Sequence, residues 1–241
     1  MVYTSIDNPR IKDCKKLQSK KYRDEKNLFF VEGEHLVLEA YKAGCLETLI
    51  LKEGLSYPLN VECIYVTDNI LKYLSEMDTY PQVMGVCRKV SERGIAGNVI
   101  VLDEVQDPGN LGTIIRSSVA FNIDSIIVSA HTVDVYNPKV VRASQGLIFY
   151  TNILVRDLTE EINKLKQDNY YIIGTKVTGG KKVETIEKKY KFAIIVGNEG
   201  SGMSKYLDDL CDTFAYIDMN EKCESLNVGV AASILLYELD K

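Results

Sequence analysis

The stretch from Phe192 to Ser204 reads FAIIVGNEGSGMS, an apolar run that enters a glycine-rich turn. A short continuous apolar run bounded by turn residues is typical of a strand that is buried on both faces of a parallel sheet. The glycines and Ser204 fall where a phosphate-binding loop of the form GxxxxGK[ST] would place them, but Met203 occupies the lysine position. The ligand of this turn is therefore the first question that the sequence raises.

Strands and helices are expected to alternate around this turn. The expected strands are NVIVLD at 98–103, SIIVSA at 125–130, YYIIGT at 170–175 and FAYID at 214–218, and the expected helices are 109–121, 138–146, 159–168, 204–210 and 225–239. The strands are continuous β-branched runs, which favours an α/β fold with a mostly parallel sheet. In such sheets ligands bind at the carboxyl ends of the strands.

A smaller α/β unit precedes this region. Its expected strands are 28–33, 46–51, 61–66 and 83–90, and its expected helices are 34–44 and 68–77. The segment 91–98, SERGIAGN, is polar, contains two glycines and has no periodicity, so we place a domain boundary there. The sequence thus predicts two domains, 1–92 and 98–241.

Composition and charge narrow the class of protein. The chain has 241 residues, of which 46% are hydrophobic and 26% are charged, the balance of a globular protein. Its net charge is -5, but residues 1–30 carry eight Lys and Arg against four acids, whereas residues 197–241 carry nine acids against three lysines. Such asymmetry favours one end that contacts a polyanion, although a solvated helix with ordinary surface lysines would give the same count.

The sequence lacks the patterns of a membrane span, a signal peptide and a metal site. No apolar run is long enough to span a bilayer, and the first residues do not resemble a signal peptide, so we expect a cytoplasmic protein without membrane contact. The six cysteines are scattered and form no CxxC pair, and there are only two histidines. We expect reduced, mostly buried cysteines and no metal site.

The glycine turn fits neither common nucleotide loop. Without the lysine it lacks the charge that reaches the terminal phosphates, and Glu199 would be pressed against the same anion. The glycines at 197, 200 and 202 are also misspaced for the dinucleotide pattern GxGxxG. Two alternatives stay open: a loop whose backbone approaches a ligand other than a polyphosphate, and a tight turn that only needs glycine conformations.

Two other stretches carry candidate functional residues. In VLDEVQDPGNLGTIIRSS, residues 101–118, we expect Asn110 to cap a helix whose buried face excludes Arg116, which is either functional or an ordinary surface residue. In CESLNVGVAASILLYEL, residues 223–239, Ser225 or Asn227 opens a helix that is apolar nearly all round. A helix of that kind is buried or packs on a partner subunit.

The three stretches together resemble the signature motifs of the SpoU/TrmH family of RNA ribose 2′-O-methyltransferases, within the SPOUT superfamily. The motifs are DPGNLGTIIRS at 107–117, IIVGNEGSGMS at 194–204 and ESLNVGVAASILLYE at 224–238, in the family's order. Upstream, FFVEGEHLVLEA at 29–40 resembles the substrate-binding domain that many members carry. The resemblance covers nearly the whole chain.

The resemblance implies a fold, a cofactor and an activity. It implies a small N-terminal α/β RNA-binding domain, followed by a parallel-sheet α/β SPOUT domain with a C-terminal trefoil knot, acting as a homodimer. The implied reaction is methyl transfer from S-adenosyl-L-methionine to a ribose 2′-hydroxyl, with ribosomal RNA as the expected substrate and with no metal. The implied catalytic residues are Arg116, Asn110, Glu199, Ser225 and Asn227. The implied cofactor-binding residues are Gly197, Ile217, Met219, Ser225, Leu226 and Asn227.

Physical chemistry constrains the role that the resemblance implies for Arg116. An arginine is effectively always charged, so it is a poor base. We therefore expect Arg116 to stabilise a developing alkoxide or to hold a neighbouring phosphate. The chain also departs from the family, since Asp218 and Glu221 stand where proline and glycine are common, next to the expected cofactor wall.

Structured RNA, most often ribosomal RNA, is the expected partner. The candidate phosphate contacts are Arg10, Lys12, Lys15, Lys16, Lys20, Lys21 and Arg23 near the N-terminus, and Lys139 and Arg142 on a helix expected in the second domain. An alternative function is an RNA-binding protein that keeps the methyltransferase fold without catalysis. The polar residues of the three motifs argue against that alternative, whereas Asp218 and Glu221 leave it open.

Overall fold

The computed structural model describes residues 2–187 and 191–241. Contacts within the chain group it into two compact units, one made of residues 1–91 and 134–150, the other of residues 92–133 and 151–241. One division between the units lies at residues 91 and 92, inside the polar segment 91–98. The segment 134–150 packs with the first unit, although the sequence suggested that it belongs to the second.

The first unit is a five-stranded mixed sheet with helices. Its strands are β1 (Val2–Tyr3), β2 (Leu28–Glu32), β3 (Leu46–Lys52), β4 (Glu62–Val66) and β5 (Val83–Arg88), in the order β1-β4-β3-β5-β2. Its helices are α1 (Pro9–Lys16), α2 (Lys20–Lys26), α3 (Glu34–Lys42), α4 (Asp68–Leu74) and α6 (Pro138–Ala143), with a short 3-10 helix, η1 (Leu147–Tyr150). Helices α1 and α4 pack on this sheet, where Ile11 and Leu71 join a core with Ile50 and Met84.

Segment 134–150 is held to the first unit by aromatic and charged contacts. The ring of Phe29 lies 4.7 Å from that of Tyr136 and 5.7 Å from that of Phe149, measured between centroids. Arg23 is 3% exposed, and its guanidinium pairs with the carboxylate of Asp134. A buried cation needs such a partner, because an unpaired charge in the interior is costly. These contacts explain why the helix at 138–143 belongs to the first unit, which the sequence pattern did not indicate.

The second unit is a parallel sheet covered on both faces. Its strands are β6 (Asn98–Leu102), β7 (Ile123–Val128), β8 (Asn152–Val155), β9 (Tyr171–Thr175), β10 (Lys181–Lys182), β11 (Phe192–Val196) and β12 (Thr213–Tyr216), in the order β10-β12-β9-β11-β6-β7-β8. The helices are α5 (Pro108–Ala120), α7 (Leu158–Gln167) and α8 (Val228–Asp240), with short 3-10 helices η2 (Val183–Thr185) and η3 (Lys205–Leu210). Among the described residues, the strand pairings of this sheet are all parallel, as predicted.

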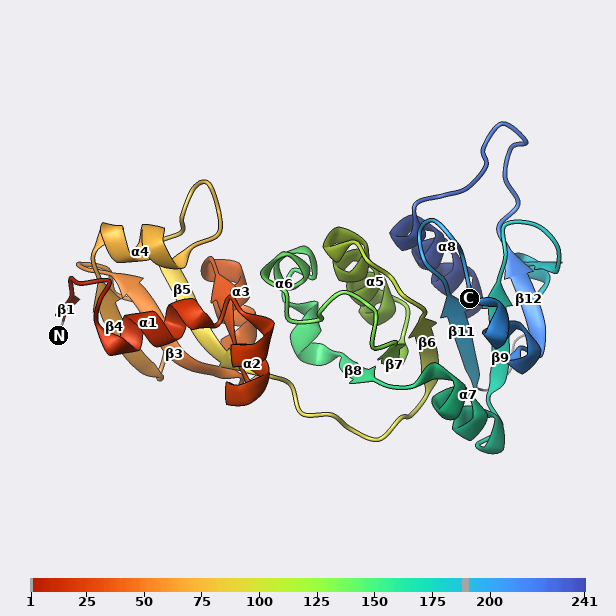
Figure 1. Cartoon of the computed structure of the whole chain (residues 1–241), viewed down its shortest axis with the longest axis horizontal. Coiled ribbons are helices and arrows are strands. Elements are labelled where there is room, and N and C mark those ends of the chain that lie inside the picture. Colours follow the sequence, from red (N-terminus) through yellow and green to blue (C-terminus); the bar gives the residue numbers. More distant parts are fainter. Residues whose placement is uncertain (1, 188–190) are drawn as a thin grey trace. The chain divides into compact units, whose positions relative to one another are not determined.

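Side chains that alternate along the strands build the two faces of this sheet. On one face Val99 and Ile195 join Leu165 of α7 and Leu207 of η3 in one apolar core. On the other, α5 packs on β7, and α8 packs along α5, as Figure 1 shows in green and dark blue. The central strand β11 is buried at every residue, which confirms the expectation drawn from its continuous apolar run.

The parallel register brings four loops to one edge of the sheet. Val196 at the end of β11 lies opposite Leu102 at the end of β6, and β12 and β9 run alongside in the same direction. The segments that follow these strands, 103–107, 176–180, 197–204 and 217–227, therefore leave the sheet at its carboxyl edge, where open α/β sheets bind ligands.

Several elements differ from the sequence prediction. The two basic N-terminal helices α1 and α2 and the edge strand β8 were not predicted, and the helix expected at 204–210 is a 3-10 helix over 205–210. Strand β8 has only four residues and pairs on one side alone, so its pattern is weak. Within the described residues, no helix is both long and apolar enough to cross a membrane.

Candidate active site

The loop after β11 is closed by its own hydrogen bonds. The backbone N–H and C=O of Asn198 exchange hydrogen bonds of 3.0 Å with the C=O and N–H of Gly202. The side-chain oxygen of Asn198 accepts from the N–H of Gly200 at 2.9 Å and from that of Ser201 at 3.1 Å. These backbone donors are therefore used inside the loop instead of pointing at a ligand. A phosphate cradle needs free donors of this kind, so the structure disfavours a nucleoside triphosphate site.

Gly197 is required where the strand enters this loop. The residue is buried, and a Cβ built on it would overlap the backbone of Gly202 and Met203. Gly202 has a φ of +72°, a conformation that L side chains rarely adopt. Gly197 and Gly202 thus allow the chain to fold back on itself in a loop that lines a cavity.

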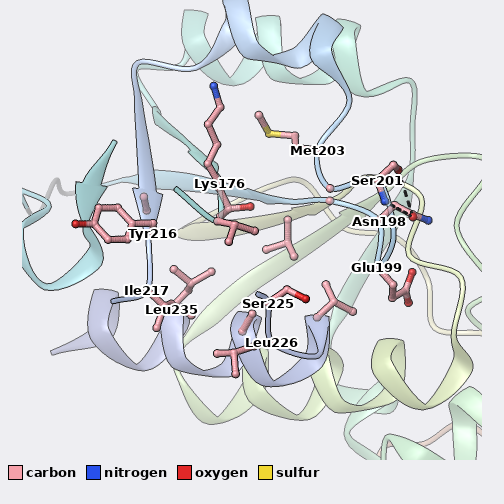
Figure 2. Close-up of a pocket in the computed structure, with 18 of the residues that line it drawn as sticks. Lys176, Asn198, Glu199, Ser201, Met203, Tyr216, Ile217, Ser225, Leu226 and Leu235 are labelled. Atoms are coloured by element: carbon pink, nitrogen blue, oxygen red, sulfur yellow. Dashed lines mark hydrogen bonds between the residues drawn. The ribbon is translucent and has the colours of Figure 1, made fainter. Parts of the chain in front are cut away.

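A cavity of about 490 Å³ lies between this loop and three other segments. Figure 2 shows Lys176 and Met203 on one side, Leu226 and Leu235 on the opposite side, and Glu199 at one end. The lining residues are 175–178 at and after the end of β9, 196–203, 205 and 208 at and after the end of β11, 215–217 and 219 around the end of β12, and 225, 226, 228, 231 and 235 before and within α8. Its volume lies in the range of roughly 300–1,000 Å³ that is typical of sites for small ligands.

A hydrogen-bonded polar cluster forms one end of the cavity. The carboxylate of Glu199 accepts from Asn110 Nδ2 at 3.0 Å, from the N–H of Asp107 at 3.1 Å and from the N–H of Gln106 at 3.2 Å. Asn227 Nδ2 donates to Asn110 Oδ1 at 2.8 Å. Glu199, Asn110 and Asn227 are far apart in the sequence, and the structure brings these three candidate catalytic residues together.

The electrostatics of Glu199 follow from these contacts. Partial burial of the carboxyl opposes its ionisation, but the hydrogen bonds from Asn110 and from the amides of Asp107 and Gln106 outweigh burial and lower the pKa of Glu199 below its ordinary value. The side chain is therefore a carboxylate at neutral pH. A fixed negative charge at the cavity favours a cationic ligand over an anionic one.

The cap of α5 differs from the sequence prediction. Asp107 caps the helix, since its side chain accepts from the N–H of Asn110 at 2.9 Å, and Pro108 is the first helical residue. The prediction of Asn110 as the cap was wrong. Because the Asp107 side chain caps the helix, the side-chain amide of Asn110 is available to bond to Glu199 and Asn227. Asn227 itself caps α8, accepting from the N–H groups of Gly229 and Val230.

Arg116 lies outside this cluster. It is exposed on α5, and its side chain makes no hydrogen bond or ion pair with any residue that the structure describes. It does not line the cavity. Ser225 does line it and is exposed. Arg116 is therefore free to meet a ligand that approaches from solvent.

The cofactor-binding residues implied by the resemblance lie largely at the cavity. Gly197, Ile217, Met219, Ser225 and Leu226 all line it, whereas Asn227 does not line it and belongs to the polar cluster. Sequence analysis did not single out Lys176 and Asp208, which also line it and pair at 3.1 Å. Both follow strands at the carboxyl edge, and the parallel order was the signal that could have found them.

Asp218 and Glu221, which stand where the family commonly has proline and glycine, differ in their contacts. Asp218 lies between the lining residues Ile217 and Met219, and its carboxylate pairs with Lys182 of the edge strand β10. Glu221 is exposed in the loop before α8. Asp218 thus ties one wall of the cavity to the sheet.

The candidate RNA contacts divide into occupied and free cations. Arg23 is buried against Asp134 and the carbonyls of Leu17 and Gln18, so it has a structural role and is removed from the candidates. Other cations have protein partners: Arg10 pairs with Glu62, Lys12 with Asp7, Lys15 with the carbonyl of Tyr73, Lys16 with Asp13, and Arg142 with Glu32. In the part of the chain that the structure describes, Lys20, Lys21 and Lys139 are exposed and their ammonium groups have no partner. Nor do three potential His, Cys, Asp or Glu metal ligands gather anywhere in the described ranges.

Comparison with known proteins gives matches over the whole chain. Residues 97–237 match the model of the SpoU rRNA Methylase family, and residues 8–85 match that of the MRM3-like substrate binding domain. The chain is 36% identical to the 23S rRNA (guanosine(2553)-2′-O)-methyltransferase RlmP of Bacillus subtilis, over 98% of this chain and 97% of the relative.

Solved structures agree with these matches. An AdoMet-bound rRNA methyltransferase from Sinorhizobium meliloti superposes with a TM-score of 0.87 at 28% identity, covering 99% of this chain and 97% of the other. The SpoU methyltransferase AviRb from Streptomyces viridochromogenes, in complex with AdoMet, superposes with a TM-score of 0.83 at 26% identity, covering 97% of each chain.

The close approach at Gly197 gives a prediction about the loop. We expect Gly197→Ala to lower the free energy of unfolding by about 2–3 kcal/mol, because a methyl group there displaces backbone atoms in a packed site. Gly200→Ala in the same loop is the matched control. A Cβ at Gly200 would meet nothing nearer than 3.6 Å, so we expect a change within about 0.5 kcal/mol. Urea unfolding measures both, and equal losses for the two variants would contradict this account of the loop.

Proposed function

This chain belongs to the SpoU rRNA methylase family, and on that premise we propose that it methylates a ribose 2′-hydroxyl in 23S ribosomal RNA, using S-adenosyl-L-methionine. The observation that carries the proposal is the joining of Glu199, Asn110 and Asn227 at a cavity of the right size for a small cofactor. The RlmP relative acts on 23S rRNA, which makes that RNA the first substrate to test. A cytoplasmic location is expected for an enzyme with this substrate.

The residues at the cavity fit S-adenosylmethionine. The lining combines apolar side chains with an ionised carboxylate at one end, which suits a neutral adenosine joined to a sulfonium cation. The self-closed glycine loop offers no cradle for phosphates. We infer that Gly197, Ile217, Met219, Ser225 and Leu226 form the cofactor wall and that Asn227 supports the neighbouring polar cluster through its hydrogen bond to Asn110.

When bound there, S-adenosylmethionine would supply an activated methyl group for transfer to the ribose oxygen. The main tasks of the protein are then alignment and the exclusion of water. Asn227 holds Asn110, and Asn110 holds Glu199 at the end of the cavity. We assign to Ser225, which is exposed at the cavity, the position nearest the incoming ribose.

Arg116 is proposed to meet the RNA during the reaction. Its guanidinium is exposed and has no partner among the described residues, so binding RNA does not require it to break an existing ion pair. As a permanent cation it stabilises the developing alkoxide or a neighbouring phosphate and does not act as a base.

Arg116→Lys tests this role. We expect the variant to bind S-adenosylmethionine with an unchanged Kd and to lose roughly 100-fold in methyl transfer, because a lysine cannot reproduce the forked donor geometry. Arg93→Lys, at an exposed position of the same unit, is the matched control and should keep full activity. Calorimetric titration with S-adenosylmethionine, with ATP as the comparison ligand, gives the Kd, and methyl incorporation into 23S rRNA from cells lacking the protein gives the rate.

Three results of that experiment separate the alternatives. Binding of S-adenosylmethionine but not ATP, with transfer that needs Arg116, supports the enzyme. Binding of rRNA without methyl transfer by the wild-type protein supports the non-catalytic RNA-binding alternative. Near-normal turnover by Arg116→Lys contradicts the role given to the guanidinium.

The first unit is proposed to bind the RNA. It matches the MRM3-like substrate binding domain, and its free cations Lys20 and Lys21 lie on α2. The double variant Lys20→Gln and Lys21→Gln should weaken RNA binding and reduce the slope of log K against log salt by about 1.5, since each phosphate contact contributes roughly 0.7–0.9. Removing the exposed lysines Lys164 and Lys181 of the second unit is the charge-matched control. An equal change in slope for both pairs would show that only net charge matters.

A homodimer is proposed through α8. This helix is apolar, and its residues Val230 and Tyr237 are 46% and 49% exposed in the single chain, although its other face is buried on α5. A second copy that covers the exposed face would remove this apolar surface from water. Light scattering should then give twice the 27.1 kDa of the chain, and Tyr237→Glu should shift the mass toward the monomer. A monomeric wild-type protein at working concentration would overturn the dimer.

A further inference from the structure

The turn between β6 and α5 has an unusual backbone. Glu104 is not a glycine, yet its φ is +59°, in the left-handed region that L residues with a long side chain seldom occupy. Such a conformation persists only where the surroundings hold it in place, and it occurs preferentially at functional sites. It lies two residues after the end of β6, at the edge of the sheet that carries the cavity.

Three side chains hold the backbone of Glu104 in this conformation. Its N–H donates to Ser129 Oγ at 3.1 Å, and its carbonyl accepts from Asn198 Nδ2 at 2.8 Å and from Gln106 Nε2 at 3.1 Å. The backbone of this residue is therefore bonded to the segment after β7, to the glycine loop and to a side chain two positions ahead. The turn reverses the chain so that the next amides face the glycine loop.

Gln106 contributes to this turn in two ways. Its side-chain amide donates to the carbonyl of Glu104 at 3.1 Å and to the carbonyl of His131 at 2.6 Å. Its own backbone N–H, and that of Asp107, donate to the two carboxylate oxygens of Glu199 at 3.2 and 3.1 Å. One exposed side chain thus closes the turn whose backbone holds Glu199.

We propose that Gln106 is a positioning residue for methyl transfer: its side-chain amide locks the 104–106 turn so that two backbone N–H groups hold Glu199 against Asn110. This inference rests on the proposed function and adds a residue to it. Gln106 does not line the cavity, so it acts through Glu199 and not on the ligand. The lowered pKa of Glu199 agrees with two amide donors held at the carboxylate.

The alternative is that Gln106 only stabilises a surface loop. Loss of its side-chain bonds would then lower stability and reduce activity independently of Glu199. A positioning role predicts instead that the effect disappears once Glu199 is changed, because the turn then has no carboxylate to hold. Two measurements therefore distinguish the roles: whether the effects of changing Gln106 and Glu199 are additive, and whether changing Gln106 alters the pKa of Glu199.

The test uses Gln106→Met, which keeps the length of the side chain and removes its donors. Gln167→Met, at an exposed glutamine at the end of α7, is the matched control. We expect Gln106→Met to lower kcat roughly 10- to 30-fold, as the loss of two neutral hydrogen bonds allows. In a Glu199→Gln background the same change should cost less than about 3-fold. If the losses in kcat from Gln106→Met and Glu199→Gln multiply in the double variant, the proposal is wrong.

A second measurement does not depend on activity. With ¹³C-labelled glutamate, NMR titration follows the Glu199 carboxyl, assigned as the signal that Glu199→Gln removes. In Gln106→Met the pKa of Glu199 should rise toward its ordinary value, because the amide donors no longer stabilise the carboxylate. In Gln167→Met it should stay where it is in the wild type.

The two measurements distinguish failure of the inference from failure of the function. If the wild-type protein methylates no RNA, the proposed function is wrong, and the titration alone decides whether Gln106 positions Glu199. An unchanged Glu199 pKa in Gln106→Met overturns the positioning role, whatever the activity.

Discussion

The site depends on one interaction, the acceptance of three hydrogen bonds by the carboxylate of Glu199. Its donors come from the turn after β6 and from the first turn of α5, while Glu199 itself belongs to the loop after β11. Asn110 extends the network to the start of α8 through Asn227. Removing a carboxylate from such a network leaves donors unsatisfied in a partly buried place, which costs more than the bonds themselves contribute.

The glycine loop shows how a phosphate-loop pattern can serve another chemistry. Its donors are consumed internally by Asn198, and Gly197 allows the backbone to pass where no side chain fits. A polyanion would find an ionised carboxylate and few free amides at this edge of the sheet. A cofactor with a neutral base and a sulfonium charge meets neither obstacle. The departure at Met203 is therefore consistent with the ligand and does not mark a damaged site.

The sequence predicted the buried strands because a central strand of a parallel sheet has a simple sequence pattern. This pattern is an apolar run with no alternation, as in β11. It did not predict β8, whose single pairing partner requires less burial, or the packing of residues 134–150 with the first unit. That packing depends on Arg23 meeting Asp134, a contact across 111 positions that no local pattern encodes. Asn110 was identified as a site residue, but its supposed capping role belongs to Asp107, since both residues are good caps and only the backbone decides between them.

Charge in the N-terminal segment is a weaker guide to RNA binding than its +4 excess suggests. Arg23 is buried and neutralised, and Arg10, Lys12 and Lys16 are paired with neighbouring carboxylates. A paired surface lysine contributes little to binding a phosphate, because the existing contact must weaken before the new one forms. In the proposed RNA-binding role, the unpaired lysines on α2 would supply attraction without sequence information. Because phosphate contacts carry no sequence information, the choice of one ribose in a folded RNA has to come from other contacts, either to the shape of the RNA or to its unpaired bases.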